Sequence, residues 1–254
     1  MTIKIDSNLA AQTLLKRRQP EQKFDCLAEN IRPYDIESAL EVHKQMIVQK
    51  QNKVAGWKCL LPPAEDKVVI APIFSDSFYT GDIAKLMPEN TKARIEPEIA
   101  FVLAEDLTAI EGGYSDEEIF AAIGSTHMAL ELMQARYQDG CDAQFYERLA
   151  DCLTNQGVFL GPEIDKETAF NASAINIEVT QNGQTTQYYG KHPNQQAGKP
   201  LSWFINFALA NGFELKKGQS IITGSFAGVL ELEFASTKVS YQGIGDYKVD
   251  LQHK

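Results

Sequence analysis

Along this 254-residue chain, the spacing of hydrophobic and polar positions is helical near the N-terminus and strand-like over most of the remainder. Apolar residues at helical spacing predict one helix over residues 7–18 and a second that begins after Asp35. The run over residues 54–61, apolar apart from Lys58 and closed by two prolines, predicts a short buried strand instead. We therefore expect a helical N-terminal region, residues 1–70, packed on a β-rich core, residues 71–254, the two forming one continuous domain.

The C-terminal third carries the clearest strand pattern. Alternating residues over 175–180 and a second stretch over 185–189 flank Asn182-Gly183, the dipeptide most typical of a two-residue hairpin turn. A helix is predicted over Trp203–Ala210. The apolar run over residues 127–133 is less specific, because it can either extend a preceding helix or form a strand.

A pair of carboxylates interrupts the most hydrophobic predicted strand. Between Ile95 and Leu103 every residue except Glu96 and Glu98 is apolar. Strand side chains alternate between faces, so these two carboxylates point the same way, about 7 Å apart. On a buried face they would repel each other, and a divalent cation between them would offset that cost. Pro97 indicates a strand start, an edge or a bulge at this point; a solvated pair at a strand end is the alternative.

Two more charged residues lie inside apolar runs. Glu131 is the third carboxylate of this kind in the chain, and Lys58 is a lone cation in the first predicted strand. Strand alternation places Lys58 opposite its two apolar neighbours, so it points either to water or into an interior site. His43 lies on the apolar face of the second helix and is expected to be structural, whereas His192, in a loop, has either a structural or a functional role.

The charge, the hydrophobic segments and the cysteines of the chain limit which partners and which cellular compartment we expect. The net charge is −10, and the longest basic run is Lys16-Arg17-Arg18, which argues against nucleic-acid or anionic-membrane surfaces. No apolar segment approaches the roughly 20 residues of a membrane helix, and the polar N-terminus is unlike a signal peptide. Four cysteines are scattered without a C-x-x-C pair, so we expect neither zinc nor a disulfide, but reduced thiols in the cytoplasm.

An ordered set of short motifs, from about residue 35 to about residue 230, resembles the 2-keto-4-pentenoate hydratase branch of the fumarylacetoacetate hydrolase superfamily. The motifs are Gly56-Trp57-Lys58, the pair Glu96 and Glu98, Ala129-Leu130-Glu131, Asp151, and a C-terminal run that ends in Thr223-Gly224-Ser225.

The resemblance implies an α+β fold, a curved mixed β-roll with N-terminal helices beside it. It also implies a bound Mg²⁺ or Mn²⁺, in agreement with the preference of hard cations for oxygen ligands. Three carboxylates would hold the ion: Glu96, Glu98 and Glu131. Three other residues would be catalytic: Lys58, Asp76 and Asp151.

The activity implied by the resemblance is addition of water to a 2-hydroxy-2,4-dienoate, through its 2-oxo-3-enoate tautomer, to give a 4-hydroxy-2-oxo acid. The expected partner is therefore a small 2-oxo or 2-hydroxy acid, with no nucleic acid and no membrane, and the family implies a homo-oligomer.

Departures from the hydratase pattern leave related activities open. Residues 59–63 lack a glycine and two hydroxyl groups that hydratases tend to have, and Gln134 stands where an aspartate is usual. The residues after Asp151 read Cys-Leu-Thr-Asn in place of a usual D-N-A-S run. The alternatives are decarboxylation of a 2-oxo-3-enedioate, C–C hydrolysis of an acylpyruvate, and a homologue that binds without turnover.

Overall fold

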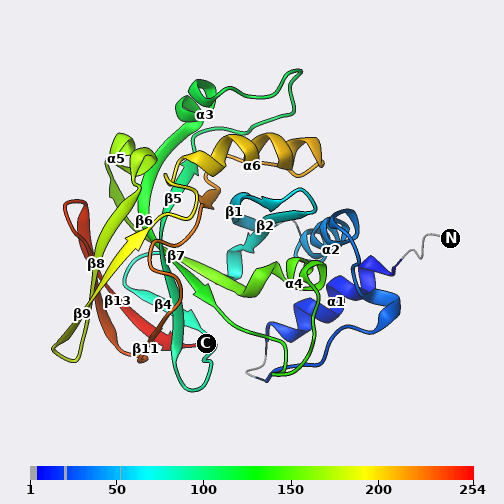
Figure 1. The fold of residues 1–254 in the computed structure, drawn as a ribbon, viewed down its shortest axis with the longest axis horizontal. Helices are drawn as coiled ribbons and strands as arrows, with labels where there is room; N and C mark the ends of the chain where they lie inside the picture. The colour runs from blue at the N-terminus through cyan, green and yellow to red at the C-terminus, as the bar shows by residue number, and fades with distance from the viewer. Residues whose placement is uncertain (1–4, 20–21, 52) are drawn as a thin grey trace.

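The computed structural model describes residues 5–19, 22–51 and 53–254 of the chain. The first residues of the polar N-terminus, for which no signal peptide is expected, lie outside this description. Figure 1 shows helices α1, α2 and α4 together on one side of a body made of strands. Within the described residues, no helix has the length and apolar character needed to cross a membrane.

The two predicted N-terminal helices are present and pack on each other. Helix α1 spans Ser7–Arg17 and is capped by Asp6, one residue before the expected start, whose carboxylate accepts a hydrogen bond from Leu9 N at 2.9 Å. Helix α2 spans Ile36–Gln49 and begins with a capping box formed by Asp35 and Ser38. The remaining helices are shorter: α3 Asp116–Ala122, α4 Phe145–Ala150, α5 Lys166–Asn171 and α6 Lys199–Ala210, with 3₁₀ turns η1 Glu29–Ile31, η2 Ser75–Ser77 and η3 Cys152–Thr154.

The strands of the described residues form two sheets, and the long strands of the larger one are curved (Figure 1). The larger has the order β2-β1-β10-β5-β6-β7-β3, with β11 also paired to β5, and mixes parallel and antiparallel pairs. Its strands are β1 Val54–Ala64, β2 Lys67–Phe74, β3 Phe78–Tyr79, β5 Ala93–Leu103, β6 Ile123–Met133, β7 Asn155–Ile164, β10 Ser220–Ile222 and β11 Leu230–Leu232. The smaller sheet has the order β4-β13-β12-β8-β9, from β4 Ile83–Leu86, β8 Ala174–Gln181, β9 Gln184–Lys191, β12 Ser236–Tyr241 and β13 Gly245–His253. The expected α+β class, a curved mixed β-roll with N-terminal helices, is confirmed.

Strand β5 is central to the larger sheet, and one of its edges is interrupted. On that edge β10 pairs with residues 100–102 and β11 with residues 93–95, so residues 96–99 have no neighbouring strand there in the described part of the chain. Pro97 falls in this gap, where a residue without an N–H group costs the sheet no ladder hydrogen bond. The proline signal in the sequence therefore marks a local edge inside a long strand.

The apolar run over residues 127–133, which the sequence left open, is a strand. Helix α3 ends at Ala122, and the chain passes directly into β6, which pairs antiparallel with β5 over nearly its whole length. The predicted hairpin is also present, with Asn182 at φ 51° and Gly183 at φ 77° in the turn between β8 and β9. Both are left-handed, as the type of turn favoured by an Asn-Gly pair requires.

The first strand is longer than predicted. It continues through Pro62-Pro63 to Ala64, because this part of β1 pairs only with β2, through an irregular register in which prolines are tolerated. Strands β1 and β2 belong to the larger sheet, so the α-helical part of the N-terminal region ends at Gln49. Buried residues of α1, α2 and the strands share one hydrophobic core. The division at residue 70 within one continuous domain stays a prediction.

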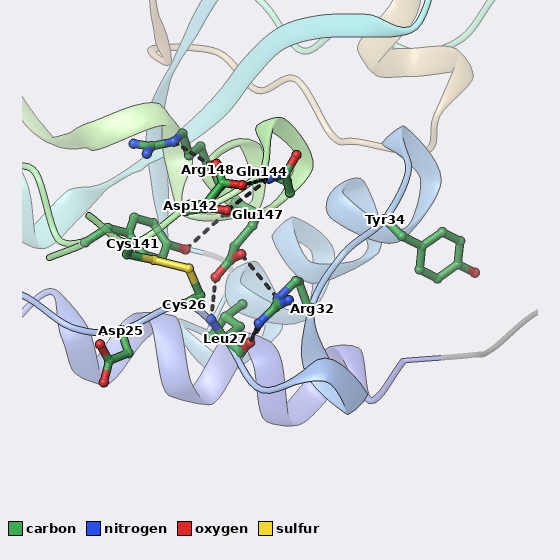
Figure 2. Close-up of polar contacts among 12 residues, drawn as sticks. Asp25, Cys26, Leu27, Arg32, Tyr34, Cys141, Asp142, Gln144, Glu147 and Arg148 are labelled. Carbon is green, nitrogen blue, oxygen red and sulfur yellow. Dashed lines mark hydrogen bonds and ion pairs between the residues drawn. A yellow bond between two sulfur atoms is a disulfide. The ribbon is translucent and has the colours of Figure 1, made fainter. Parts of the chain in front are cut away.

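The expectation of unpaired cysteines is wrong for two of the four. Cys26 and Cys141 form a disulfide (Figure 2), whereas Cys59 and Cys152 are free and buried. The two cysteines are 115 residues apart in the sequence, and backbone hydrogen bonds between Phe24 and residues 136–138 bring them together. No local sequence pattern reveals such a long-range pairing. The expectation of a cytoplasmic location rested on reduced thiols, and the disulfide removes that support.

A buried carboxylate fastens the same N-terminal segment to α4. Glu147 accepts a hydrogen bond from the backbone N–H of Leu27, and its other oxygen lies 3.5 Å from Nε of Arg32 (Figure 2). Together with the disulfide, this network attaches the connection between α1 and α2 to the rest of the fold.

His43 is structural, as predicted. It is fully buried on α2, and its Nε2 lies 2.7 Å from the carbonyl oxygen of Leu149, to which it donates when neutral. Burial lowers the pKa of the His43 imidazole from 6.5 to about 4, and the Leu149 hydrogen bond opposes this only in part. The folded protein therefore holds this histidine in the neutral form at pH 7.

We expect the protein to lose stability as the pH falls from about 6.5 to about 4, since His43 takes up a proton in this range only after unfolding. The contribution has a maximal slope of about 1.4 kcal/mol per pH unit. Urea unfolding at pH 7, 6 and 5 should show a shallower pH dependence for His43→Gln than for the wild type. His253→Gln, which removes an exposed histidine, should keep the wild-type dependence. Parallel curves for all three proteins would contradict this account.

Candidate metal centre

Three glutamates of two adjacent strands converge on one point of the larger sheet. Glu96 and Glu131 are direct cross-strand partners on β5 and β6, and Glu98 lies two residues further along the same face of β5. One carboxylate oxygen from each lies within 4.8 Å of the others. Glu98 and Glu131 are buried and Glu96 is half-buried, so the group is open to solvent on the Glu96 side. The structure thus brings together the three residues that the sequence singles out as metal ligands.

Protein donors fix some of these oxygens and leave one free. Oε1 of Glu131 accepts hydrogen bonds from Nζ of Lys58 at 2.7 Å and from Nδ2 of Asn155 at 2.9 Å. Its Oε2 is buried and has no hydrogen-bond partner among the described residues. Oε2 of Glu98 accepts from the backbone N–H of Gly224 at 2.7 Å. A buried carboxylate oxygen without a donor is costly, and a cation would satisfy it.

The electrostatics of the cluster also favour a cation. Burial, and then the neighbouring Glu131, raise the pKa of Glu96 to about 7. Burial, Glu131 and Glu96 together raise the pKa of Glu98 well above its ordinary range. Ionising all three carboxylates therefore requires added positive charge. An all-oxygen donor set suits a hard divalent ion such as Mg²⁺, Mn²⁺ or Ca²⁺ better than zinc or copper, so the residues fit the implied metal.

Lys58 points into this site and not to water. Its neighbours Trp57 and Cys59 are buried on the opposite face of β1, as strand alternation predicts. Besides Glu131, the ammonium group has the carbonyl oxygen of Leu153 at 3.5 Å. Burial alone would lower the pKa of Lys58, but Glu131 and Glu96 outweigh it and hold the pKa above the ordinary value. The lysine therefore remains a cation beside the three carboxylates.

A strained turn borders the site. The η3 residues Cys152, Leu153 and Thr154 have φ values of 58°, 50° and 67°. Residues other than glycine rarely adopt this left-handed backbone conformation. This turn presents the Leu153 carbonyl to Lys58 and leads into Asn155, which holds Glu131.

Asp151, a predicted catalytic residue, lies immediately before this turn. It is buried, and its two carboxylate oxygens accept from Nε of Arg136 at 2.9 and 2.8 Å, while Nη2 of Arg136 donates to the Asp151 carbonyl at 2.6 Å. In this arrangement Asp151 anchors the turn and stands outside the group of three glutamates. Its catalytic role stays a prediction.

Asp76, the other predicted catalytic carboxylate, lies in η2 between β2 and β3 and forms an ion pair with Lys50 at the C-terminal end of α2. It is not one of the three grouped carboxylates. Its catalytic role also stays a prediction.

Two contributors to the site were not among the predicted site residues: Asn155 and Gly224. A Cβ at Gly224 would lie 2.5 Å from Cδ2 of Leu60, and the residue has φ 120°, so only glycine fits beside Glu98. His192 supports this loop, with its Nε2 2.9 Å from the Thr223 carbonyl and its Nδ1 accepting from Asn194 N. Burial lowers the pKa of the His192 imidazole to about 4, so it is neutral at pH 7 and supports the loop that carries Gly224. The T-G-S run was the available signal for this loop.

The fold and the carboxylate cluster define a mixed β-roll protein with a candidate site for a hard divalent cation. A family model for the C-terminal region of fumarylacetoacetate (FAA) hydrolase matches residues 48–250, which is most of the chain. The chain therefore belongs to the FAA hydrolase family, and the resemblance drawn from its motifs is confirmed.

Curated relatives agree with the hydratase branch. The chain is 25% identical to a 2-keto-4-pentenoate hydratase of Paraburkholderia phymatum over 186 residues, which are 70% of this chain and 68% of the relative. It is 27% identical to a 2-hydroxyhexa-2,4-dienoate hydratase of Comamonas testosteroni over 136 residues, which are 53% of this chain and 50% of that protein. The expected relation to hydro-lyases is thereby confirmed.

Solved structures share the fold. The 4-oxalocrotonate decarboxylase of Pseudomonas putida G7, complexed with magnesium and adipate, has a TM-score of 0.74 at 14% identity and covers 96% of this chain and 97% of its own. A 2-hydroxyhepta-2,4-diene-1,7-dioate isomerase of Mycobacterium marinum has a TM-score of 0.55 at 16% identity, over 79% of this chain and 76% of its own.

Proposed function

We propose that this protein is a metal-dependent hydratase that converts a 2-hydroxy-2,4-dienoate into a 4-hydroxy-2-oxo acid. The observation that carries the proposal is the lysine ammonium group 2.7 Å from Glu131, at the edge of a cluster of three carboxylates. Both curated relatives bear the names of hydratases that act on compounds of this type.

Glu96, Glu98 and Glu131 would hold Mg²⁺ or Mn²⁺, and the free Oε2 of Glu131 is the oxygen best prepared for this role. The bound ion supplies Lewis-acid stabilisation of the negative charge that develops on the 2-oxygen of the substrate. Asn155 and Gly224 keep the glutamate oxygens in place, so that the site is organised before substrate arrives.

Lys58 has two tasks in the proposed reaction. Three ionised glutamates outweigh one divalent ion by one negative charge, so the ammonium group is needed to attract a carboxylate substrate. It also exchanges a proton during tautomerisation, which moves a proton from the 2-hydroxyl group to carbon 5. Water then adds a hydroxyl group at carbon 4 and a proton at carbon 3. Glu131 and the Leu153 carbonyl orient the ammonium group for this work.

Decarboxylation of a 2-oxo-3-enedioate is the second candidate. It uses the same stabilised enolate and needs no delivery of water, and the decarboxylase of Pseudomonas putida G7 shares the fold over nearly its whole length. C–C hydrolysis of an acylpyruvate, binding without turnover, and a homo-oligomeric state also stay as predictions.

A panel of 2-hydroxydienoates, 2-oxo-3-enedioates and acylpyruvates, incubated with the protein and Mg²⁺, distinguishes these functions. Ultraviolet absorbance and CO₂ release are recorded together, with EDTA-treated protein as the control. Hydration predicts loss of the dienoate band without CO₂, and this loss should disappear with EDTA. Release of CO₂ from the enedioate would favour the decarboxylase, cleavage of the acylpyruvate would favour the hydrolase, and no turnover with any compound would favour a binding protein.

A further inference from the structure

A second charged site lies away from the three glutamates. A small pocket of about 90 Å³ is enclosed between the end of α1, the end of α2, the η2 turn and the last residue of the chain. Its charged and aromatic lining consists of Arg18, Lys50, Phe74, Asp76 and Lys254. Neither the three glutamates nor Lys58 contributes to its wall.

Arg18 is the unusual residue of this pocket. It is only 9% exposed, and among the described residues neither Nη1 nor Nη2 has a hydrogen-bond partner. The guanidinium group lies 5.7 Å from the centre of the Phe74 ring, a contact that compensates for only part of the lost hydration. Burial, followed by the nearby Arg136, lowers the pKa of Arg18, and nearby acidic groups, Asp76 among them, oppose this only in part. A buried guanidinium group whose terminal nitrogens have no acceptor is costly, and an anion would remove that cost.

The other charges of the pocket do not supply that anion. Among the described residues of the lining, Asp76 is the only one with a carboxylate side chain, and it is paired with Lys50. Lys254 adds a third cation, so the described lining residues carry two more positive than negative side chains. Burial lowers the pKa of Lys254, and the repulsion of Arg18 and Lys50 lowers it further against the opposing effect of Asp76. The pocket is thus locally cationic in a chain whose net charge is −10.

We propose that this pocket binds a small oxyanion, a carboxylate or phosphate-type group, through the guanidinium group of Arg18. The two free terminal nitrogens form a planar fork that matches two oxygens of such a group, and Lys254 adds charge. The volume of about 90 Å³ is several times that of one water site, yet far below that of pockets for larger ligands. The ligand is therefore an anion of a few heavy atoms, or one acidic end of a longer molecule.

Calorimetry with inorganic phosphate and with acetate tests this site independently of the metal centre. The full chain is titrated with EDTA present and ionic strength held constant, so that neither a bound metal nor general screening produces the signal. We expect saturable binding to the wild type, weakened at least about tenfold in Arg18→Gln, which removes a charged donor. Tighter binding of phosphate assigns a phosphate-type ligand, and tighter binding of acetate assigns a carboxylate.

Two further variants make the result specific. Lys254→Gln removes the charge of a lining residue that is more exposed than Arg18, and it should weaken binding less than Arg18→Gln does. Lys58→Met removes the cation of the metal centre and should bind the anion like the wild type. Absence of saturable wild-type binding, undiminished binding by a folded Arg18→Gln, or loss of binding in Lys58→Met would overturn the proposal. If Arg18→Gln does not fold, unchanged binding by Lys254→Gln would count against it.

Discussion

Glu131→Gln is expected to abolish tight binding of Mg²⁺ and Mn²⁺ while leaving the metal-free fold intact. The amide oxygen can still accept hydrogen bonds from Lys58 and Asn155, as Oε1 does now. The amide NH₂ group then occupies the place of Oε2, where it cannot bind a cation. The same change removes one charge from a crowded anionic cluster, so it should not destabilise the metal-free protein greatly.

Titration calorimetry and thermal unfolding together check this result. At a metal concentration 100 times the dissociation constant, the wild type should gain about 2.7 kcal/mol of stability, and Glu131→Gln should gain almost none. Glu231→Gln is the matched control, because β11 lies beside β5 and the Glu231 side chain is exposed. Wild-type metal affinity in Glu131→Gln would show that the three glutamates do not form the site.

Lys58→Met is expected to lower kcat/KM by about 10³-fold, through losses in both substrate affinity and turnover, since proton transfer alone is typically worth 10²–10⁴-fold. The change removes the cation nearest the three carboxylates and leaves Oε1 of Glu131 with Asn155 as its remaining donor. Lys58→Arg should keep part of the affinity and lose most of the turnover, because a guanidinium group pairs with carboxylates yet does not release its proton.

Steady-state kinetics on the substrate found active in the panel provides the measurement. Lys238→Met, which removes a lysine on the surface of β12 paired with Asp246, should retain wild-type kinetics. If Lys58→Met remains within a few-fold of wild-type kcat/KM, the lysine has no part in the reaction, whatever its position beside Glu131.

The sequence predicted those elements whose signals act between near neighbours in the chain. Asp35 caps a helix because its side chain and that of a residue three positions later each accept a hydrogen bond from the other's backbone N–H group. Asn182-Gly183 forms a turn because these two residue types themselves favour the left-handed backbone conformation. The pair Glu96 and Glu98 faced one side because strand geometry leaves no other choice. Where strand pairing decided the outcome, local signals left β6 open between helix and strand, and they missed the extension of β1 past Pro62.

The sequence by itself thus determined which charged residues lie in apolar strands and which way the two central carboxylates point. Only the tertiary structure decided what those residues contact, since the partners are distant in the chain: 73 residues separate Lys58 from Glu131, and 126 separate Glu98 from Gly224. The same holds for the disulfide across 115 residues and for the terminal nitrogens of Arg18, which have no hydrogen-bond partner among the described residues. Such contacts depend on strand register and packing, which are set by the burial of the whole core and not by any short stretch of sequence.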